Sequence, residues 1–220
     1  MLRALGHPVS FVGLLVGFLA AILAATAGQH ACARMLGVRT APREPSAAGW
    51  IDPYGAVAAI LGGPGWGIVD TPTNRSKARR CIVLLAGPAI ALVIGVAALA
   101  GYAYRAGGRQ FLYGADLGQV VHGLQGPAGQ VLLVCIGLEA VTVGLLMLIP
   151  LPPLTGWHVL SLFVRPTTSW QRTRMYLEER NIGVLILLVL TVLPLGGDLP
   201  ILVQILDWIV GRILRAVAGG

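Results

Sequence analysis

Charged residues are scarce in this sequence of 220 residues. They make up 11% of the chain, whereas soluble domains carry about 25%. Hydrophobic residues make up 56%, and the mean hydropathy is +0.79. These values exclude a soluble globular domain, and the few charges also exclude a long coiled coil. We therefore expect an integral membrane protein with little mass outside the bilayer.

Cysteines and aromatic residues are also few. The three cysteines are odd in number and lie far apart in apolar sequence, which excludes a disulfide framework and a zinc knuckle. No aromatic residue lies within the densest basic run, 75–80, where a base-stacking surface would need them. Nucleic acid is therefore excluded as a partner.

The net charge of +7 comes from basic residues in three groups, at 34–43, 75–80 and 165–180. In membrane proteins such groups mark cytoplasmic loops. We therefore predict an integral protein of a bacterial-type plasma membrane with these three loops in the cytoplasm. Contact with anionic lipid headgroups would explain the arginines of 165–180. A solvated helix and a docking surface for a soluble partner are the alternatives there.

Long apolar runs predict the spans, because about 20 helical residues cross the hydrocarbon core. We expect an all-α fold in which residues 1–220 form a single membrane domain with about five transmembrane helices. The first run, 9–34, also has features of a cleaved signal peptide, but it continues into a helix-like segment, which favours a span. The expected spans are 9–34, 81–104, a span in the first part of 130–165, and two C-terminal spans within 182–216.

The stretch 50–69 is apolar but interrupted by four glycines and a proline between 62 and 67. Because basic groups flank it on both sides, it cannot simply cross the membrane. A re-entrant hairpin, shielded from lipid by other helices, satisfies both the charges and the broken backbone.

Three sequence motifs are informative together. GQHACARMLG ends the first apolar run, GWIDPYGAV opens the hairpin, and LLMLIPLPPLTG ends the apolar segment that begins at 130. The set resembles the site-2 protease family of intramembrane zinc metalloproteases, in its compact form without a PDZ or CBS domain. The resemblance implies a site-2-protease-like core, in which 130–165 holds a span, a proline-rich turn and a short helix.

In that family two histidines of an HExxH helix and a distant aspartate hold Zn²⁺, and the glutamate acts as general base. Placing this sequence on the pattern puts Thr26 at the first histidine, Ala27 at the glutamate and Thr155 at the aspartate. Only His30 remains as a ligand. Loss of a positioned general base alone costs about 10² to 10⁴ in rate. The resemblance therefore implies a catalytically inactive relative that needs no cofactor.

The scaffold positions of the family are kept. In the family the hairpin and the proline-rich turn help to line the cleft that holds the substrate, so the resemblance implies that a membrane protein partner binds there. The matching partner-cleft residues are Asp52, Pro53, Trp66, Pro150, Pro152, Pro153 and Gly156.

Three functions stay open from the sequence. The first is binding or scaffolding of other membrane proteins, as a subunit of a larger complex. The second is a metalloprotease or other metalloenzyme whose zinc site is rebuilt from His30 with Glu139 or His158. The third is transport or proton handling through Glu139, because ionisable residues within spans are costly and often functional.

Overall fold

The computed structural model describes residues 6–40, 49–104, 107–114, 117–122, 124, 126–194 and 199–219. Residues 41–43 of the first basic group and 195–198 of the C-terminal segment lie outside this part. Within the described residues the secondary structure is helical, apart from two isolated antiparallel bridges, Arg39 to Thr73 and Ile51 to Gly67. The predicted all-α class is confirmed for these residues.

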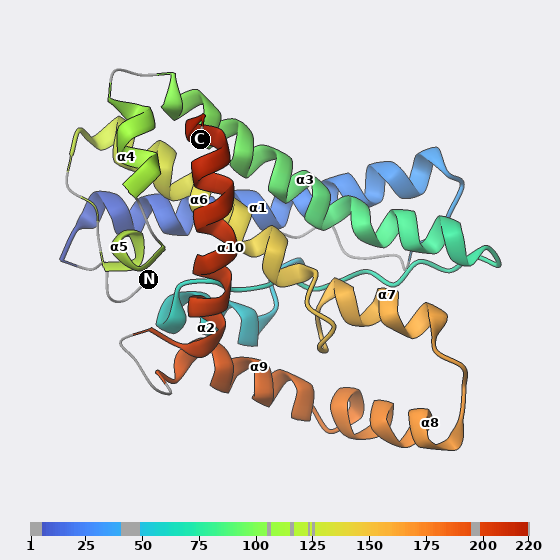
Figure 1. Cartoon of the computed structure of the whole chain (residues 1–220). Coiled ribbons are helices and arrows are strands. Elements are labelled where there is room, and N and C mark those ends of the chain that lie inside the picture. The colour runs from blue at the N-terminus through green and yellow to red at the C-terminus, as the bar shows by residue number, and fades with distance from the viewer. Residues whose placement is uncertain are drawn as a thin grey trace.

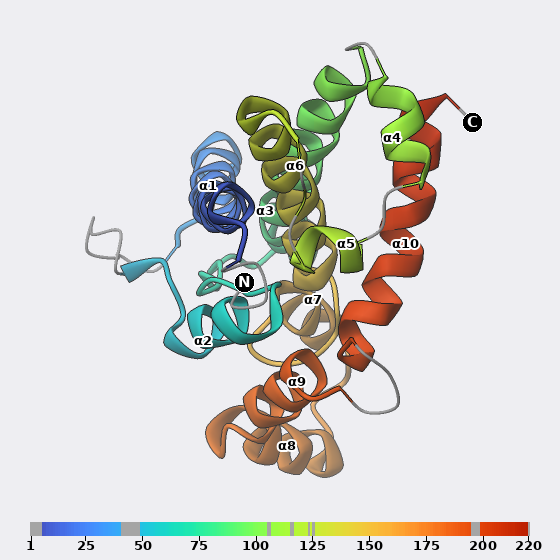
Figure 2. The same ribbon diagram turned by 90° about the vertical axis from the view of Figure 1, so that its left-hand side faces the viewer.

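Three helices are long and apolar enough to cross a membrane: α1 (Pro8–Met35), α3 (Lys77–Ala103) and α6 (Ala128–Met147). They coincide closely with the first three expected spans and mark the chain as a membrane protein. The three helices pack against one another as a bundle (Figure 1 and Figure 2). The buried share of the apolar 18-residue stretch in each helix is 72% for α6, 50% for α1 and 39% for α3. α6 is therefore the central helix.

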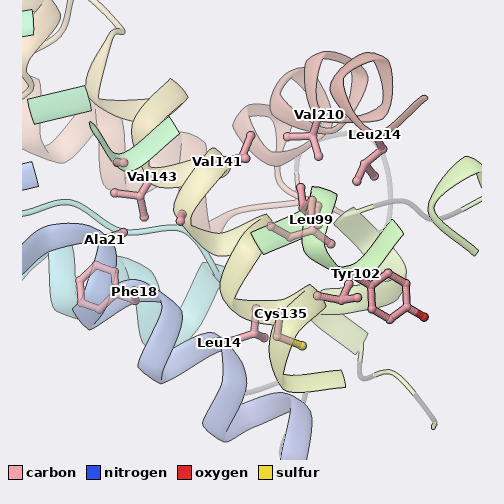
Figure 3. Packing of buried hydrophobic residues seen from close by; sticks show 14 of the residues in the cluster. Leu14, Phe18, Ala21, Leu99, Tyr102, Cys135, Val141, Val143, Val210 and Leu214 are labelled. Atoms are coloured by element: carbon pink, nitrogen blue, oxygen red, sulfur yellow. The ribbon is translucent and has the colours of Figure 1, made fainter. Parts of the chain in front are cut away.

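Small residues allow these helices to approach closely, as is usual for helix packing in membranes. A Cβ on Gly13 of α1 would lie 2.8 Å from the Cβ of Cys135 in α6. A Cβ on Gly95 of α3 would lie 2.6 Å from the backbone nitrogen of Val141. Larger residues such as Leu14 and Leu99 fill the core around these contacts (Figure 3).

The C-terminal helix α10 (Ile201–Ala218) runs across this bundle (Figure 1). It contacts α3, α6 and the short helices α4 (Gly108–Gly114) and α5 (Leu117–His122). Asp207 ties it to α5 by accepting a 2.6 Å hydrogen bond from the backbone N–H of Leu117. Its apolar residues Val210 and Leu214 enter the same core as the bundle.

The stretch 50–69, where the sequence predicts a hairpin, forms a helix followed by an extended return leg. Asp52 caps α2 (Pro53–Gly62) by accepting hydrogen bonds from the N–H groups of Tyr54 and Gly55 at 2.8 and 2.9 Å. The helix ends at Gly63, whose φ of 113° suits glycine. An extended return leg, residues 63–70, then brings Gly67 back beside Ile51.

The remaining segment consists of α7 (Thr155–Phe163), α8 (Thr168–Arg174), the short helix η3 (Met175–Glu179) and α9 (Ile182–Val192). The expected span at 182–195 is represented by α9, an apolar helix of 11 residues, whereas a straight crossing takes about 20. α10 carries Asp207, Arg212 and Arg215. The total of five spans therefore stays a prediction.

Candidate functional site

The return leg of the hairpin lies along the face of α1 that carries Thr26 and His30. A Cβ on Gly65 would lie 2.8 Å from Cε2 of Phe18, and one on Gly67 would lie 2.7 Å from Cγ2 of Ile22. Positions four apart share a helix face, so 18, 22, 26 and 30 form one stripe. The return leg therefore covers this stripe of α1.

The end of the return leg is fixed to α1 at two adjacent residues. Nε2 of His30 lies 2.9 Å from Oδ2 of Asp70. The side-chain amide of Gln29 donates a 2.6 Å hydrogen bond to the backbone carbonyl of Asp70. Both Gln29 and Asp70 are buried. The single remaining ligand of the resembled zinc site thus lies against a carboxylate of this chain.

The other positions that the sequence resemblance aligns with the family's zinc site are Thr26, Ala27 and Thr155. Thr26 is buried in α1, whereas Ala27, at the position of the general base, is exposed. Thr155 is buried as the first residue of α7, a helix that packs on α3. A Cβ on Gly156 would lie 2.1 Å from the carbonyl oxygen of Leu148, so the start of α7 requires glycine at this position.

The residues of the alternative zinc site are not brought together. Within the described residues, no three His, Cys, Asp or Glu side chains are grouped so that they could hold a metal ion. His30 faces Asp70, and Glu139 lies in α6 beside Gly17 of α1. His158 lines a separate cavity with Glu178 and Arg174. The described residues therefore offer no rebuilt set of zinc ligands.

Glu139 is 2% exposed, and its Oε1 atom is buried without a hydrogen-bond partner in the part of the chain that is described.

His158 lies in α7, outside the three candidate spans. Burial lowers its pKa, Glu178 opposes this shift and Arg174 adds to it. Its imidazole is therefore neutral at pH 7.

The expected partner-cleft residues lie mainly in packed positions. Trp66 is fully buried, in one cluster with Ala58, Leu154 and Leu187. Pro152 is buried against Gly183 of α9, whereas Pro150 is exposed. Asp52 and Pro53 form the start of α2. In this structure Trp66 therefore joins the hairpin to the proline-rich turn and does not line an open cleft.

Sequence reasoning missed Asp70. Its signal was a lone carboxylate directly after the glycine-rich hairpin, far from other acidic residues in the chain.

Comparison of the chain with protein-family models, curated proteins and solved structures finds no match.

Proposed function

We propose that this chain is a non-proteolytic membrane protein with a site-2-protease-like core that binds another membrane protein, as one subunit of a complex. The observation that carries the proposal is the contact of His30 with Asp70. At the helix face where the resembled family holds zinc, this chain has a histidine engaged by its own hairpin.

The side chains at the matching positions support the loss of peptide hydrolysis. A catalytic zinc site needs three protein ligands and an open position for water. Thr26 and Thr155 are poor substitutes for histidine and aspartate, and Ala27 has no group that could accept a proton. The buried, tightly packed motif segments support a retained scaffold, because glycine is required sterically at positions such as Gly156.

Restoring the family residues tests the placement of the motifs. We expect the triple variant Thr26→His, Ala27→Glu, Thr155→Asp to bind about one zinc per chain, since it restores all three ligands of the family pattern. The matched control keeps Thr155 and carries only the first two changes. Zinc is measured by plasma mass spectrometry on folded protein in detergent. A folded triple variant that holds no more zinc than the control would falsify the placement on the site-2 protease pattern.

Binding of a partner is tested separately. The full chain is purified from its native membrane in mild detergent after cross-linking, and its companions are quantified by mass spectrometry. We expect one membrane protein in stoichiometric amount. A chain that is recovered alone and monomeric, with and without cross-linking, contradicts the scaffold function.

One observation favours a second candidate function, proton handling through Glu139. Its carboxyl is buried between α6 and α1, with one oxygen that has no hydrogen-bond partner among the described residues, and ionisable groups in spans often serve transport. The test is proton flux in proteoliposomes. Flux that disappears in Glu139→Gln supports this function, and flux equal to that of empty liposomes removes it.

A further inference from the structure

A cavity of about 690 Å³ lies between the N-terminal end of α3, helix α7 and the α8–η3 segment. It is separate from the His30 to Asp70 contact and plays no part in the function proposed above. Its ionisable lining residues are Lys77, Arg80, His158, Arg174 and Glu178.

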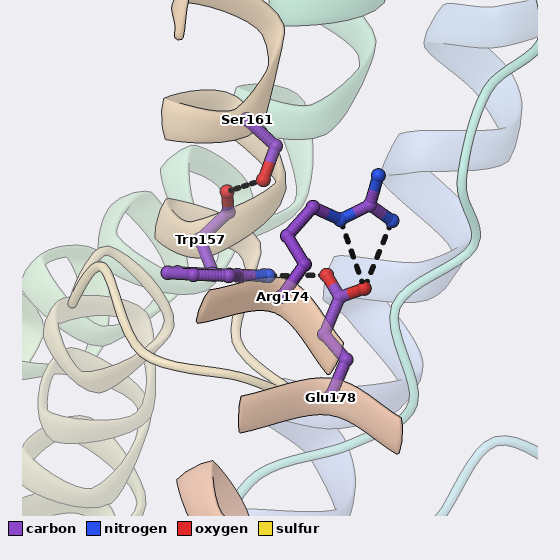
Figure 4. Close-up of polar contacts among 4 residues, drawn as sticks. All are labelled: Trp157, Ser161, Arg174 and Glu178. Carbon is purple, nitrogen blue, oxygen red and sulfur yellow. Dashed lines mark hydrogen bonds and ion pairs between the residues drawn. The ribbon is translucent and has the colours of Figure 1, made fainter. Parts of the chain in front are cut away.

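The charge of this cavity is positive. Lys77, Arg80 and Arg174 face a single carboxylate, that of Glu178. Glu178 is itself fully engaged (Figure 4). One oxygen accepts from the indole N–H of Trp157, and the other from Nη2 and Nε of Arg174 at 2.9 and 3.2 Å. Because the neutral His158 adds no charge, an excess of two positive charges remains in the lining.

The excess charge belongs to Lys77 and Arg80. The Nε atom of Arg80 is buried and has no hydrogen-bond partner in the described part of the chain. Lys77, one turn earlier, is exposed and has no ion pair there. A buried cationic donor without an acceptor is costly. An anion in the cavity would supply the acceptor that this guanidinium needs.

The position of the cavity indicates the kind of anion. Lys77 and Arg80 lie in the first turn of α3, at the positive end of its dipole and at the start of an apolar span. Leu84, one turn further into the span, also lines the cavity, as do Leu162 and Trp170. Cationic groups thus lie at the entrance of the span, and the apolar Leu84 lies one turn deeper.

We propose that this cavity binds a phosphate group through Lys77 and Arg80, with Arg174 as a third cation positioned by Glu178. The apolar lining would contact the part of the molecule attached to the phosphate. A phospholipid headgroup and a soluble phosphate ester share this chemistry. Arginine and lysine both suit phosphate, arginine as a planar fork and lysine as a point charge.

The test uses the full chain, stripped of lipid in a neutral detergent. Binding of phosphatidylglycerol, of diacylglycerol, which lacks the phosphate, and of inorganic phosphate is measured by native mass spectrometry and thermal shift. Lys77→Gln with Arg80→Gln is expected to weaken phosphatidylglycerol binding by about tenfold or more, since each basic contact to an anionic headgroup contributes several-fold. The control is Arg75→Gln with Arg172→Gln, which removes equal charge outside the cavity lining.

The results separate the two sources. Binding of phosphatidylglycerol alone supports a lipid site, and binding of inorganic phosphate as well supports a soluble phosphate ester. Equal affinity for diacylglycerol and phosphatidylglycerol, or equal losses in the test and control variants, overturns the proposal. The single variant Lys77→Gln changes only an exposed side chain. If the double variant does not fold, this single variant still decides the test. An unchanged affinity of Lys77→Gln for phosphatidylglycerol also counts against the site.

Discussion

Nε2 of His30 lies 2.9 Å from Oδ2 of Asp70. A carboxylate accepts hydrogen bonds, so this ring nitrogen carries a proton whether the imidazole is neutral or charged. Metal binding at Nε2 would therefore have to displace this contact. The contact also joins residues 40 positions apart in the chain, and it fixes the return leg of the hairpin along α1.

Gln29 makes the neighbouring contact, and its removal is expected to destabilise the fold. Gln29→Leu keeps the size of the side chain but leaves the buried carbonyl of Asp70 without the 2.6 Å hydrogen bond. Loss of a typical hydrogen bond costs about 0.5–1.5 kcal/mol. Denaturant unfolding in detergent micelles, followed by circular dichroism, measures the change.

Gln204→Leu is the matched control. Gln204 also donates to a backbone carbonyl, that of Leu199, but in an exposed position. Its replacement is expected to change the free energy of unfolding by less than about 0.5 kcal/mol, as for other surface substitutions. Equal losses in the two variants would mean that Gln29 does not anchor the hairpin.

The close approach of the return leg predicts a large effect of Gly65→Ala. The added Cβ would lie 2.4 Å from the carbonyl oxygen of Gly55 and 2.6 Å from the Cβ of Ala59. Such overpacking typically costs about 1–3 kcal/mol, which thermal unfolding resolves. Gly129→Ala is the control, because nothing lies within 4 Å of its Cβ position. In helix α6 alanine should raise stability by about 0.5–1 kcal/mol, so a loss there would contradict the packing described.

The long apolar runs predicted the central bundle because hydropathy and length are local properties. The runs 9–34 and 81–104 correspond to α1 (Pro8–Met35) and α3 (Lys77–Ala103) within a few residues. The end of helix α2 at Gly62 was also predictable, since the glycines and Pro64 interrupt any continuous helix.

The contacts that define the candidate site were not predictable in this way. Asp70 meets His30, and Arg80 meets the α7–α8 region, only after the chain has folded back on itself. Asp207 likewise accepts from the N–H of Leu117, which lies 90 positions away in the chain. Such pairs depend on packing between distant segments, which periodicity does not encode.

Glu178 predicts a pH dependence of stability. Burial raises its pKa, but the hydrogen bonds from Trp157 and Arg174 and the nearby positive charge outweigh this and hold the pKa below its ordinary value of 4.5. The unfolded chain therefore binds this proton more readily than the folded one. The stabilisation by Glu178 is present above about pH 4.5 and is lost as the pH falls through the folded-state pKa.

We accordingly expect Glu178→Gln to be less stable than the wild type at pH 7, with a difference that shrinks steadily below about pH 4.5. Melting temperatures measured from pH 7 down to pH 3 check this. Glu179→Gln is the control, because its exposed side chain should change little at any pH. A difference that grows on acidification would contradict the sign of the shift.

Glu139 predicts a stabilising substitution. Its side chain is 2% exposed, and Oε1 has no hydrogen-bond partner within the described residues. Glu139→Met keeps the length of the side chain and removes an unsatisfied polar group, which is expected to raise the free energy of unfolding by about 1–3 kcal/mol. Glu139→Ala, which leaves a cavity between α6 and α1, should instead lower it. Thermal unfolding in detergent compares the two variants with the wild type. A lower melting temperature for Glu139→Met would show that the carboxyl forms a stabilising interaction and would contradict this prediction.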